Sequence, residues 1–153
     1  MTFCKSLFCN IPKVLLIITL FFNFTYADSG TLYFGDAASG QIDIMYNFES
    51  DVAGFQFDID GVSGLSTSGG AAEDAGFQVS AGSSTVIGFS FSGATIDAGS
   101  GLLATLLYDS ILSDTVTLTL GTGAITAPGG IDLTPNVNDS LTHPTDCNGD
   151  YYG

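Results

Sequence analysis

The sequence predicts an all-β protein: an antiparallel two-sheet jelly-roll sandwich of about eight or nine short strands, preceded by a signal peptide. Three observations support this fold class. Apolar and polar residues alternate along most of the chain, which is the period of strands with one face in a core. Clusters of Gly, Ser, Asp and Pro separate the alternating runs. No heptads or internal repeats interrupt this pattern.

Residues 1–27 predict a secretory signal peptide. They contain both basic residues of the chain, followed by the apolar run Val14–Phe22 and by Thr25-Tyr26-Ala27, which places small residues at the −3 and −1 positions of a cleavage site. An uncleaved N-terminal anchor is the alternative. Removing 27 of the 153 residues leaves 126, enough for one domain, with no later run that could span a membrane. We therefore expect a secreted protein, extracellular or at the cell surface, without membrane insertion after cleavage.

The expected mature chain is strongly acidic. All sixteen carboxylate side chains lie after residue 27, where no Lys or Arg remains, so the formal charge is −16. Such a surface repels nucleic acid and anionic lipid, and we exclude both as partners. It attracts cations or a basic protein face. Adaptation to salty water is the plainer explanation of the charge.

The expected strands follow one another closely along residues 28–137. Gly101–Tyr108 is apolar on both faces and fits a covered central strand better than a short helix. Gly70–Ala75 can form one helical turn. From Asn136 onward the alternation stops, so we expect a linker and a polar tail, with the domain ending at 137 and the tail at 138–153. The remaining expected strands are Thr31–Phe34, Gln41–Phe48, Gly54–Asp60, Phe77–Ser80, Thr85–Phe91, Asp114–Leu120 and Ile131–Leu133, the last at an edge because prolines flank it.

Carboxylates on one strand are the first candidate site. Gln56, Asp58 and Asp60 share the polar side of Gly54–Asp60, opposite three apolar side chains. Asp58 and Asp60, at i and i+2, lie about 6.5–7 Å apart on the same face, where they could bind Ca²⁺ or act as acid and base. A solvated outer face is the alternative. We favour this solvated face over catalysis or metal binding, and Gln56, Asp58 and Asp60 are candidate contacts for a partner on it.

Other catalytic chemistry lacks its residues. The only histidine, His143, lies in the expected tail, and neither a G-x-S-x-G motif nor a zinc ligand set is present. Hydrolysis by two carboxylates stays open, because acids are abundant. The sequence thus predicts a protein that is not an enzyme. The Phe residues of Thr85–Phe91 and the other strands alternate as expected core, and the tyrosines lie within strands, which indicates packing rather than a sugar platform.

The tail contains part of a calcium loop. Asp146, Asn148 and Asp150 occupy positions 1, 3 and 5 of such a loop, but Tyr151 replaces the glycine at position 6 and no position 12 follows. A polar tail without metal is the alternative. Cys147 has no partner within the mature chain, so it either bridges to another chain or has lost its partner. Asn138 begins a glycosylation sequon, relevant only in a eukaryotic secretory pathway.

The order of these elements resembles a known family. The run VAGFQFDI at residues 52–59, followed by GFQVS, TVIGFSFSGATIDAGSGLLATLLY and TVTLTL, is similar to cohesin-type domains of the cohesin and carbohydrate-binding-module β-sandwich superfamily. The resemblance spans residues 31–137. It implies a secreted jelly-roll sandwich that binds a protein partner. In the family this partner is a dockerin, a calcium-loaded module of polysaccharide-degrading enzymes.

We therefore expect a non-catalytic binding or adhesion module, which either binds a dockerin-like protein or takes part in polysaccharide-associated scaffolding. The alternative is a carbohydrate-binding module, with Ca²⁺ as its one candidate cofactor, and a third hypothesis is a small glycoside-active enzyme. The tail also resembles the Asp/Cys/Gly-rich runs beside such domains, which implies that the chain is part of a larger protein.

Overall fold

The structure, a computed structural model, describes residues 30–143. The expected signal peptide, the partial calcium loop at Asp146, Asn148 and Asp150, and Cys147 lie outside these residues. Within residues 30–143, no helix is long and apolar enough to cross a membrane. The described elements are β1 (Gly30–Ala38), β2 (Gln41–Phe48), β3 (Gly54–Asp60), β4 (Val62–Ser63), β5 (Ser66–Ser68), α2 (Gly70–Asp74), β6 (Gln78–Ala81), β7 (Thr85–Phe89), β8 (Gly99–Leu107), β9 (Ser110–Ile111), β10 (Thr115–Thr119), β11 (Ile125–Ala127), β12 (Ile131–Leu133) and β13 (Asn136–Thr142).

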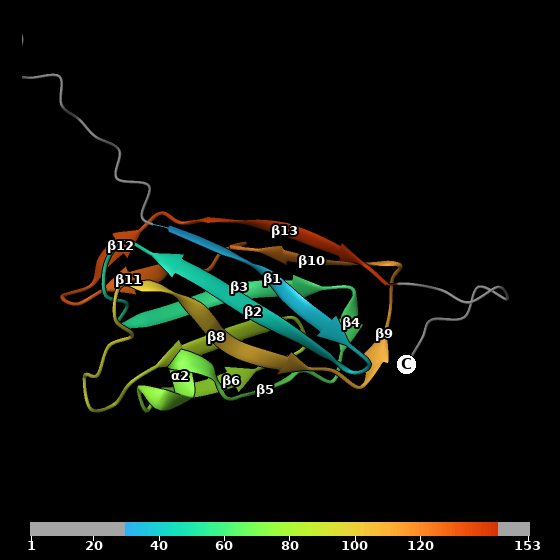
Figure 1. The fold of residues 1–153 in the computed structure, drawn as a ribbon, viewed down its shortest axis with the longest axis horizontal. Coiled ribbons are helices and arrows are strands. Elements are labelled where there is room, and N and C mark those ends of the chain that lie inside the picture. Colours follow the sequence, from blue (N-terminus) through green and yellow to red (C-terminus); the bar gives the residue numbers. More distant parts are fainter. Residues whose placement is uncertain (1–29, 144–153) are drawn as a thin grey trace, which may run out of the picture.

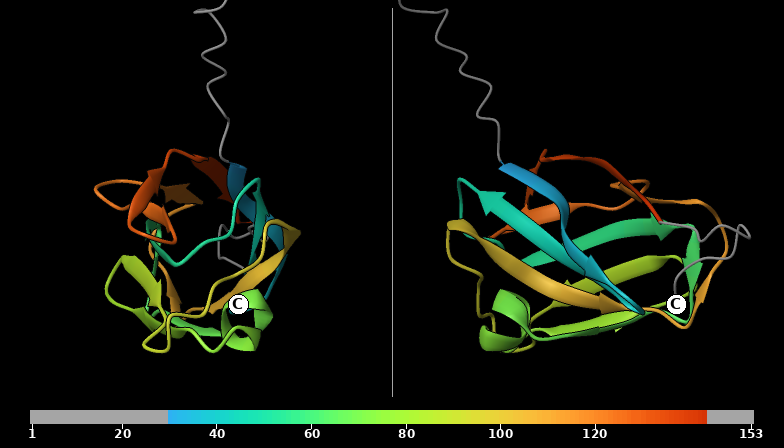
Figure 2. Two further views of the ribbon diagram at one scale, coloured as in Figure 1. Left: turned by 90° about the vertical axis from the view of Figure 1, so that its left-hand side faces the viewer. Right: turned by 45° about the vertical axis from the view of Figure 1, so that its right-hand side comes forward.

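The strands form two facing layers around one core (Figures 1 and 2). One layer has the order β5-β8-β2-β1, and the other contains β6-β7-β3-β10, with β11 and β12 beside β3. Strand β13 pairs with both β1 and β10, so hydrogen bonding continues from one layer into the other as an 11-stranded sheet. Strands β4 and β9 form a separate two-stranded sheet. The prediction of an all-β sandwich is confirmed.

Two details of the predicted fold class are wrong. The sheet is mixed rather than antiparallel, because β1 and β13 run parallel, with Thr31 opposite Asn136 and Leu32 opposite Val137. A parallel pair needs a long connection between its strands, and here almost the entire domain is that connection. The structure also has more strands than about eight or nine. Strands β4, β5, β9 and β11 have only two or three residues, too few to display a period.

The polar C-terminal segment is a strand and not a linker. Residues Asn136–Thr142 form β13, which extends past residue 137, where the sequence placed the end of the domain. Val137 is buried, whereas Asp139 replaces an apolar residue at the next inward position. Its carboxylate accepts hydrogen bonds from the backbone N–H of Phe34 at 2.9 Å and of Ser140 at 2.8 Å. These bonds hold a charged side chain where the alternation of apolar residues predicts none.

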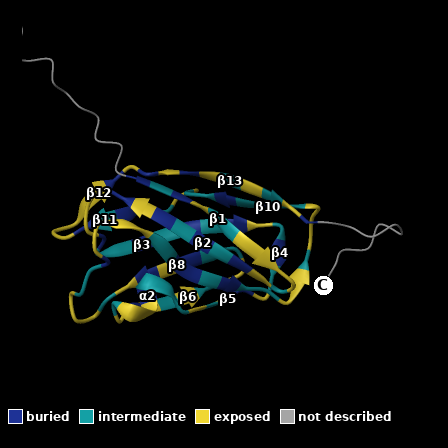
Figure 3. Cartoon of the chain, viewed as in Figure 1, coloured by how far each residue is buried: buried dark blue, intermediate teal, exposed yellow. Residues whose placement is uncertain are grey.

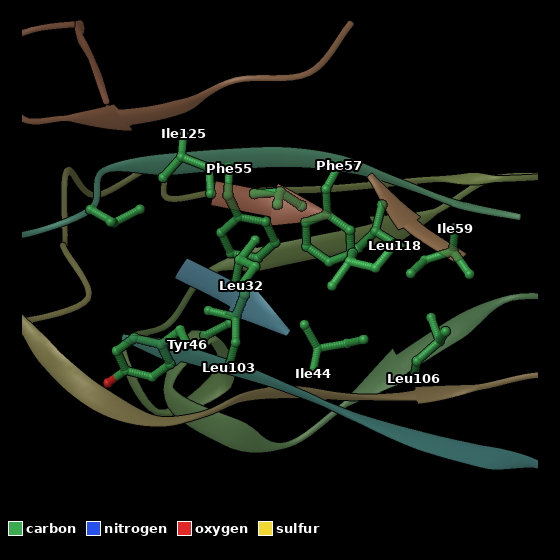
Figure 4. Close-up of a cluster of buried hydrophobic side chains, with 14 of the residues drawn as sticks. Leu32, Ile44, Tyr46, Phe55, Phe57, Ile59, Leu103, Leu106, Leu118 and Ile125 are labelled. Carbon is green, nitrogen blue, oxygen red and sulfur yellow. The ribbon is translucent and has the colours of Figure 1, made fainter. Parts of the chain in front are cut away.

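Strand β3 supplies the centre of the core. Figure 4 shows Phe55 and Phe57 pointing across the interior toward the opposite layer. Their ring centroids lie 5.8 Å apart, and both side chains are almost fully buried. Burial follows the middle of the strands, whereas the loops at both ends are exposed (Figure 3). The alternation predicted for Gly54–Asp60 is thus confirmed.

Three further predictions about local structure are confirmed. Strand β8 contains Leu103 and Leu106, both with no exposed area, so the doubly apolar segment is a covered strand and not a helix. The single helical turn expected at Gly70–Ala75 is α2, whose Ala72 is buried. Strand β12 ends the sheet order, as the flanking prolines indicate.

Candidate functional site

The three polar residues predicted on β3 face away from the core. Because side chains alternate along a strand, the burial of Phe55 and Phe57 places Gln56, Asp58 and Asp60 on the outer side of the layer. Gln56 and Asp58 are half-buried and Asp60 is exposed. The sequence therefore assigned the sides of this strand correctly.

The two carboxylates differ in their surroundings. Asp58 lies between Thr85 of β7 and Thr119 of β10, and its Oδ1 accepts a hydrogen bond from Thr85 Oγ1 at 2.7 Å. A Cβ at Gly121 would collide with the other carboxylate oxygen, Oδ2, so the chain passes close to it. Asp60 lies opposite Thr117, and its side chain forms no hydrogen bond with any described residue. Asp58 is consequently fixed, whereas Asp60 is available to a partner.

An apolar stripe lies beside these residues. Ile87 and Phe89 on β7 are 39% and 38% exposed, and Phe91, just after the strand, is 84% exposed. Ile87 lies opposite Gln56 in the β3–β7 pair. The rings of Phe89 and Phe91 meet edge to face, with centroids 4.8 Å apart and an interplanar angle of 80°. We call Ile87, Phe89 and Phe91 together with Gln56, Asp58 and Asp60 the β7 face.

This stripe corrects the expected core. The run Thr85–Phe91 alternates, but its buried side is Val86 and Gly88 rather than the more apolar side. Gly88 lies opposite Phe55, and any side chain at Gly88 would overlap the Phe55 ring. Phe55 thus fills the space that β7 leaves empty. Because Gly88 lacks a side chain, only knowledge of its strand partner could have revealed this arrangement.

His143 is buried and not part of a solvated tail, as the sequence had suggested. Its side chain is 6% exposed, and its ring centroid lies 5.7 Å from that of Tyr108. Its backbone N–H donates a hydrogen bond to the Asp114 carbonyl at 2.9 Å. Burial lowers the pKa of the imidazole from its usual 6.5, because the charged form loses hydration. This buried histidine directly follows the last residue of β13.

A metal site in residues 30–143 would need several ligating side chains at one place. These residues contain no group of three or more His, Cys, Asp or Glu side chains arranged to hold a metal ion. Asn138, the sequon residue, is exposed in β13 opposite Thr119, in the same cross-strand row as Asp58. It therefore lies on the outer side of the same layer, two strands away from β3.

Comparison with known proteins identifies the fold. No family model and no curated protein matches the chain. A non-cellulosomal cohesin from the hyperthermophilic archaeon Archaeoglobus fulgidus matches with a TM-score of 0.53 and 16% identity, over 74% of this chain and 90% of that chain. A structure of the complex between CaCohA2 and a CaDoc0917 variant matches with a TM-score of 0.50 and 16% identity, over 74% and 98%. The chain has a cohesin fold, as the resemblance of residues 31–137 implied.

Proposed function

We propose that this protein is a secreted, non-catalytic binding module that captures a protein partner on the β7 face. The observation that carries the proposal is the exposed stripe of Ile87, Phe89 and Phe91 on and just after β7, on the outer side of its layer. Large apolar side chains gathered at one place on a surface mark interaction sites far more often than single exposed ones do. Aromatic side chains in particular supply much of the binding energy of protein interfaces.

The polar residues beside the stripe complete an interface of the usual composition. Interfaces combine an apolar centre with a polar rim, and Gln56 and Asp58 border the stripe along β3. Asp58 is already held by its hydrogen bond from Thr85, so the binding of a partner would cost little conformational entropy in this side chain. Asp60, which has no such bond among the described residues, can pair with a basic group at the rim.

The fold indicates the kind of partner. One of the two similar structures is a complex in which CaCohA2 is crystallised with a CaDoc0917 variant, so a protein of this fold binds a second protein module. We infer that a dockerin-like module is the partner here. The carbohydrate-binding alternative receives less support. Phe89 and Phe91 are nearly perpendicular and offer no common plane for sugar rings, and Tyr33 is the single exposed tyrosine among residues 30–143.

The test compares variants on the two outer faces of the sandwich. Phe89→Ala removes the centre of the stripe, whereas Tyr33→Ala removes an aromatic ring of similar exposure (39% against 38%) from β1 in the opposite layer. Both are assayed by calorimetry against a panel of calcium-loaded dockerin modules. We expect Phe89→Ala to weaken binding about 30-fold, as for an interface hot spot of about 2 kcal/mol, and Tyr33→Ala to leave it unchanged.

Two outcomes would contradict the proposal. If the unmodified protein binds none of the modules, the dockerin-like partner is wrong. If Tyr33→Ala abolishes binding while Phe89→Ala does not, the partner binds the opposite layer and the β7 face is wrong.

A further inference from the structure

We propose that a small pocket at the β6 edge of the β7 face binds the ammonium group of a lysine side chain presented by the partner. The pocket has a volume of about 210 Å³ and lies where β5, α2 and β6 meet, and Ala104 of β8 also lines it. These elements are adjacent at one side of the sandwich in Figure 1. The pocket is lined by Thr67, Ser68, Gly69, Glu73, Phe77, Gln78, Val79 and Ala104.

The size and floor of the pocket suit an extended alkyl chain. Phe77 and Ala104 are buried, with 5% and 3% exposure, and Val79 is half-buried beside them. Methylene groups placed against these side chains leave water at little loss of hydrogen bonding. Pockets for drug-sized ligands typically measure about 300–1,000 Å³, so this smaller pocket fits a single side chain better than a larger ligand.

One carboxylate gives the pocket its charge preference. Glu73 is the only ionisable residue in the lining. Its Oε2 accepts a hydrogen bond from the backbone N–H of Gly69 at 2.5 Å, which fixes the carboxylate beside the first turn of α2. In the described part of the chain this N–H is its sole hydrogen-bond partner, so Oε1 can still accept. A lysine ammonium offers three donors, and Thr67, Ser68 and Gln78 supply further acceptors around it.

The pocket adjoins the proposed interface. Gln78 lines the pocket and also lies directly opposite Phe89 in the β6–β7 pair. Strand β6 pairs only with β7 among the described strands, so it forms the edge of the layer next to the pocket. A partner seated on the stripe can therefore extend a side chain over this edge. The strongly acidic chain, with sixteen Asp and Glu against two Lys and Arg, complements a basic partner.

The assignment of the lysine to a protein partner rests on the proposed function, but binding of the ammonium group does not. The test therefore uses a small probe, Nα-acetyl-lysine methylamide, titrated to about 50 mM against the isotope-labelled protein and followed by NMR. We expect saturable shifts at the backbone amides of Gly69, Glu73 and Gln78. The norleucine analogue, which has an alkyl chain without the charge, should bind at least about fivefold more weakly.

Matched variants separate the pocket from general acidity. Glu73→Gln keeps an acceptor for the Gly69 N–H and removes the charge, and should weaken probe binding about fivefold. Asp74→Asn makes the same charge change at an exposed neighbour outside the lining, and should leave binding unchanged. Equal weakening by both variants, or no saturable shift at these amides, would overturn the proposal. If the probe binds as expected while Phe89→Ala leaves dockerin binding intact, the β7 face fails and the lysine site stands.

Discussion

The orientation of β7 decides whether the β7 face exists, and stability measurements test it directly. Val86 is 1% exposed, so Val86→Ala removes two buried methyl groups. At about 0.8 kcal/mol for each, plus the cavity left behind, the loss in unfolding free energy should be about 2–3 kcal/mol. Phe89 is larger but 38% exposed on the outer side, so Phe89→Ala should cost less than about 1 kcal/mol.

Gly88→Ala provides an independent test of the same orientation. The added Cβ would overlap the ring of Phe55, which is buried against β7, and such overpacking should destabilise the protein by about 1–3 kcal/mol. Urea unfolding followed by circular dichroism gives the midpoint and the slope m for all three variants. The slope should stay constant while the midpoint falls for Val86→Ala and Gly88→Ala. A loss for Phe89→Ala as large as that for Val86→Ala would refute the reasoning, because Phe89 would then belong to the core.

Two further predictions concern pH and salt. The lowered pKa of His143 means that the folded state resists protonation of this imidazole. His143 should therefore contribute no pH dependence to the unfolding free energy above pH 6.5, and its contribution should lower the unfolding free energy as the pH falls below 6.5. His143→Gln should remove this part of the pH dependence in urea unfolding, and identical profiles for the two proteins would contradict it. The excess of acids should make the melting temperature rise on addition of about 0.5 M NaCl, because salt screens their mutual repulsion. An unchanged melting temperature in a calorimetric scan would show that this repulsion contributes little.

The sequence predicts the structure well where the residue pattern within one strand is enough to assign its two faces. Along β3, Phe55, Phe57 and Ile59 alternate with polar residues, and this local pattern is sufficient to assign both faces. The same alternation correctly predicts that Gln56, Asp58 and Asp60 lie on the outer side. Whether these residues contact a partner stays a prediction.

The errors arise where the determining partner lies far away in the sequence. Asp139 can occupy an inward position of β13 because the N–H of Phe34, 105 residues earlier, donates to it. The parallel pairing of β1 and β13 likewise joins the two ends of the described chain. Neither contact leaves a periodic signal in its own segment, so local patterns indicated a linker. In the candidate site, the exposure of Phe89 and Phe91 could not be predicted for the same reason. The alternation in Thr85–Phe91 defines two sides of the strand but does not say which side faces the core.

Gly88 accounts both for the packing of the core against β7 and for the exposure of the apolar stripe on the outer side of this strand. The absence of a side chain there lets Phe55 fill the interior against β7 and stack on Phe77, with ring centroids 6.0 Å apart. With the core filled from β3, the apolar residues on the other side of β7 remain in water. An exposed apolar strand next to an edge strand favours aggregation, and the many acids of the chain oppose it by repulsion. A basic partner would cover the stripe, and its positive charge would also offset the mutual repulsion of the carboxylates around the stripe. A neutral apolar ligand would cover the stripe but leave this repulsion in place. The combination therefore favours a basic protein over other occupants of the β7 face.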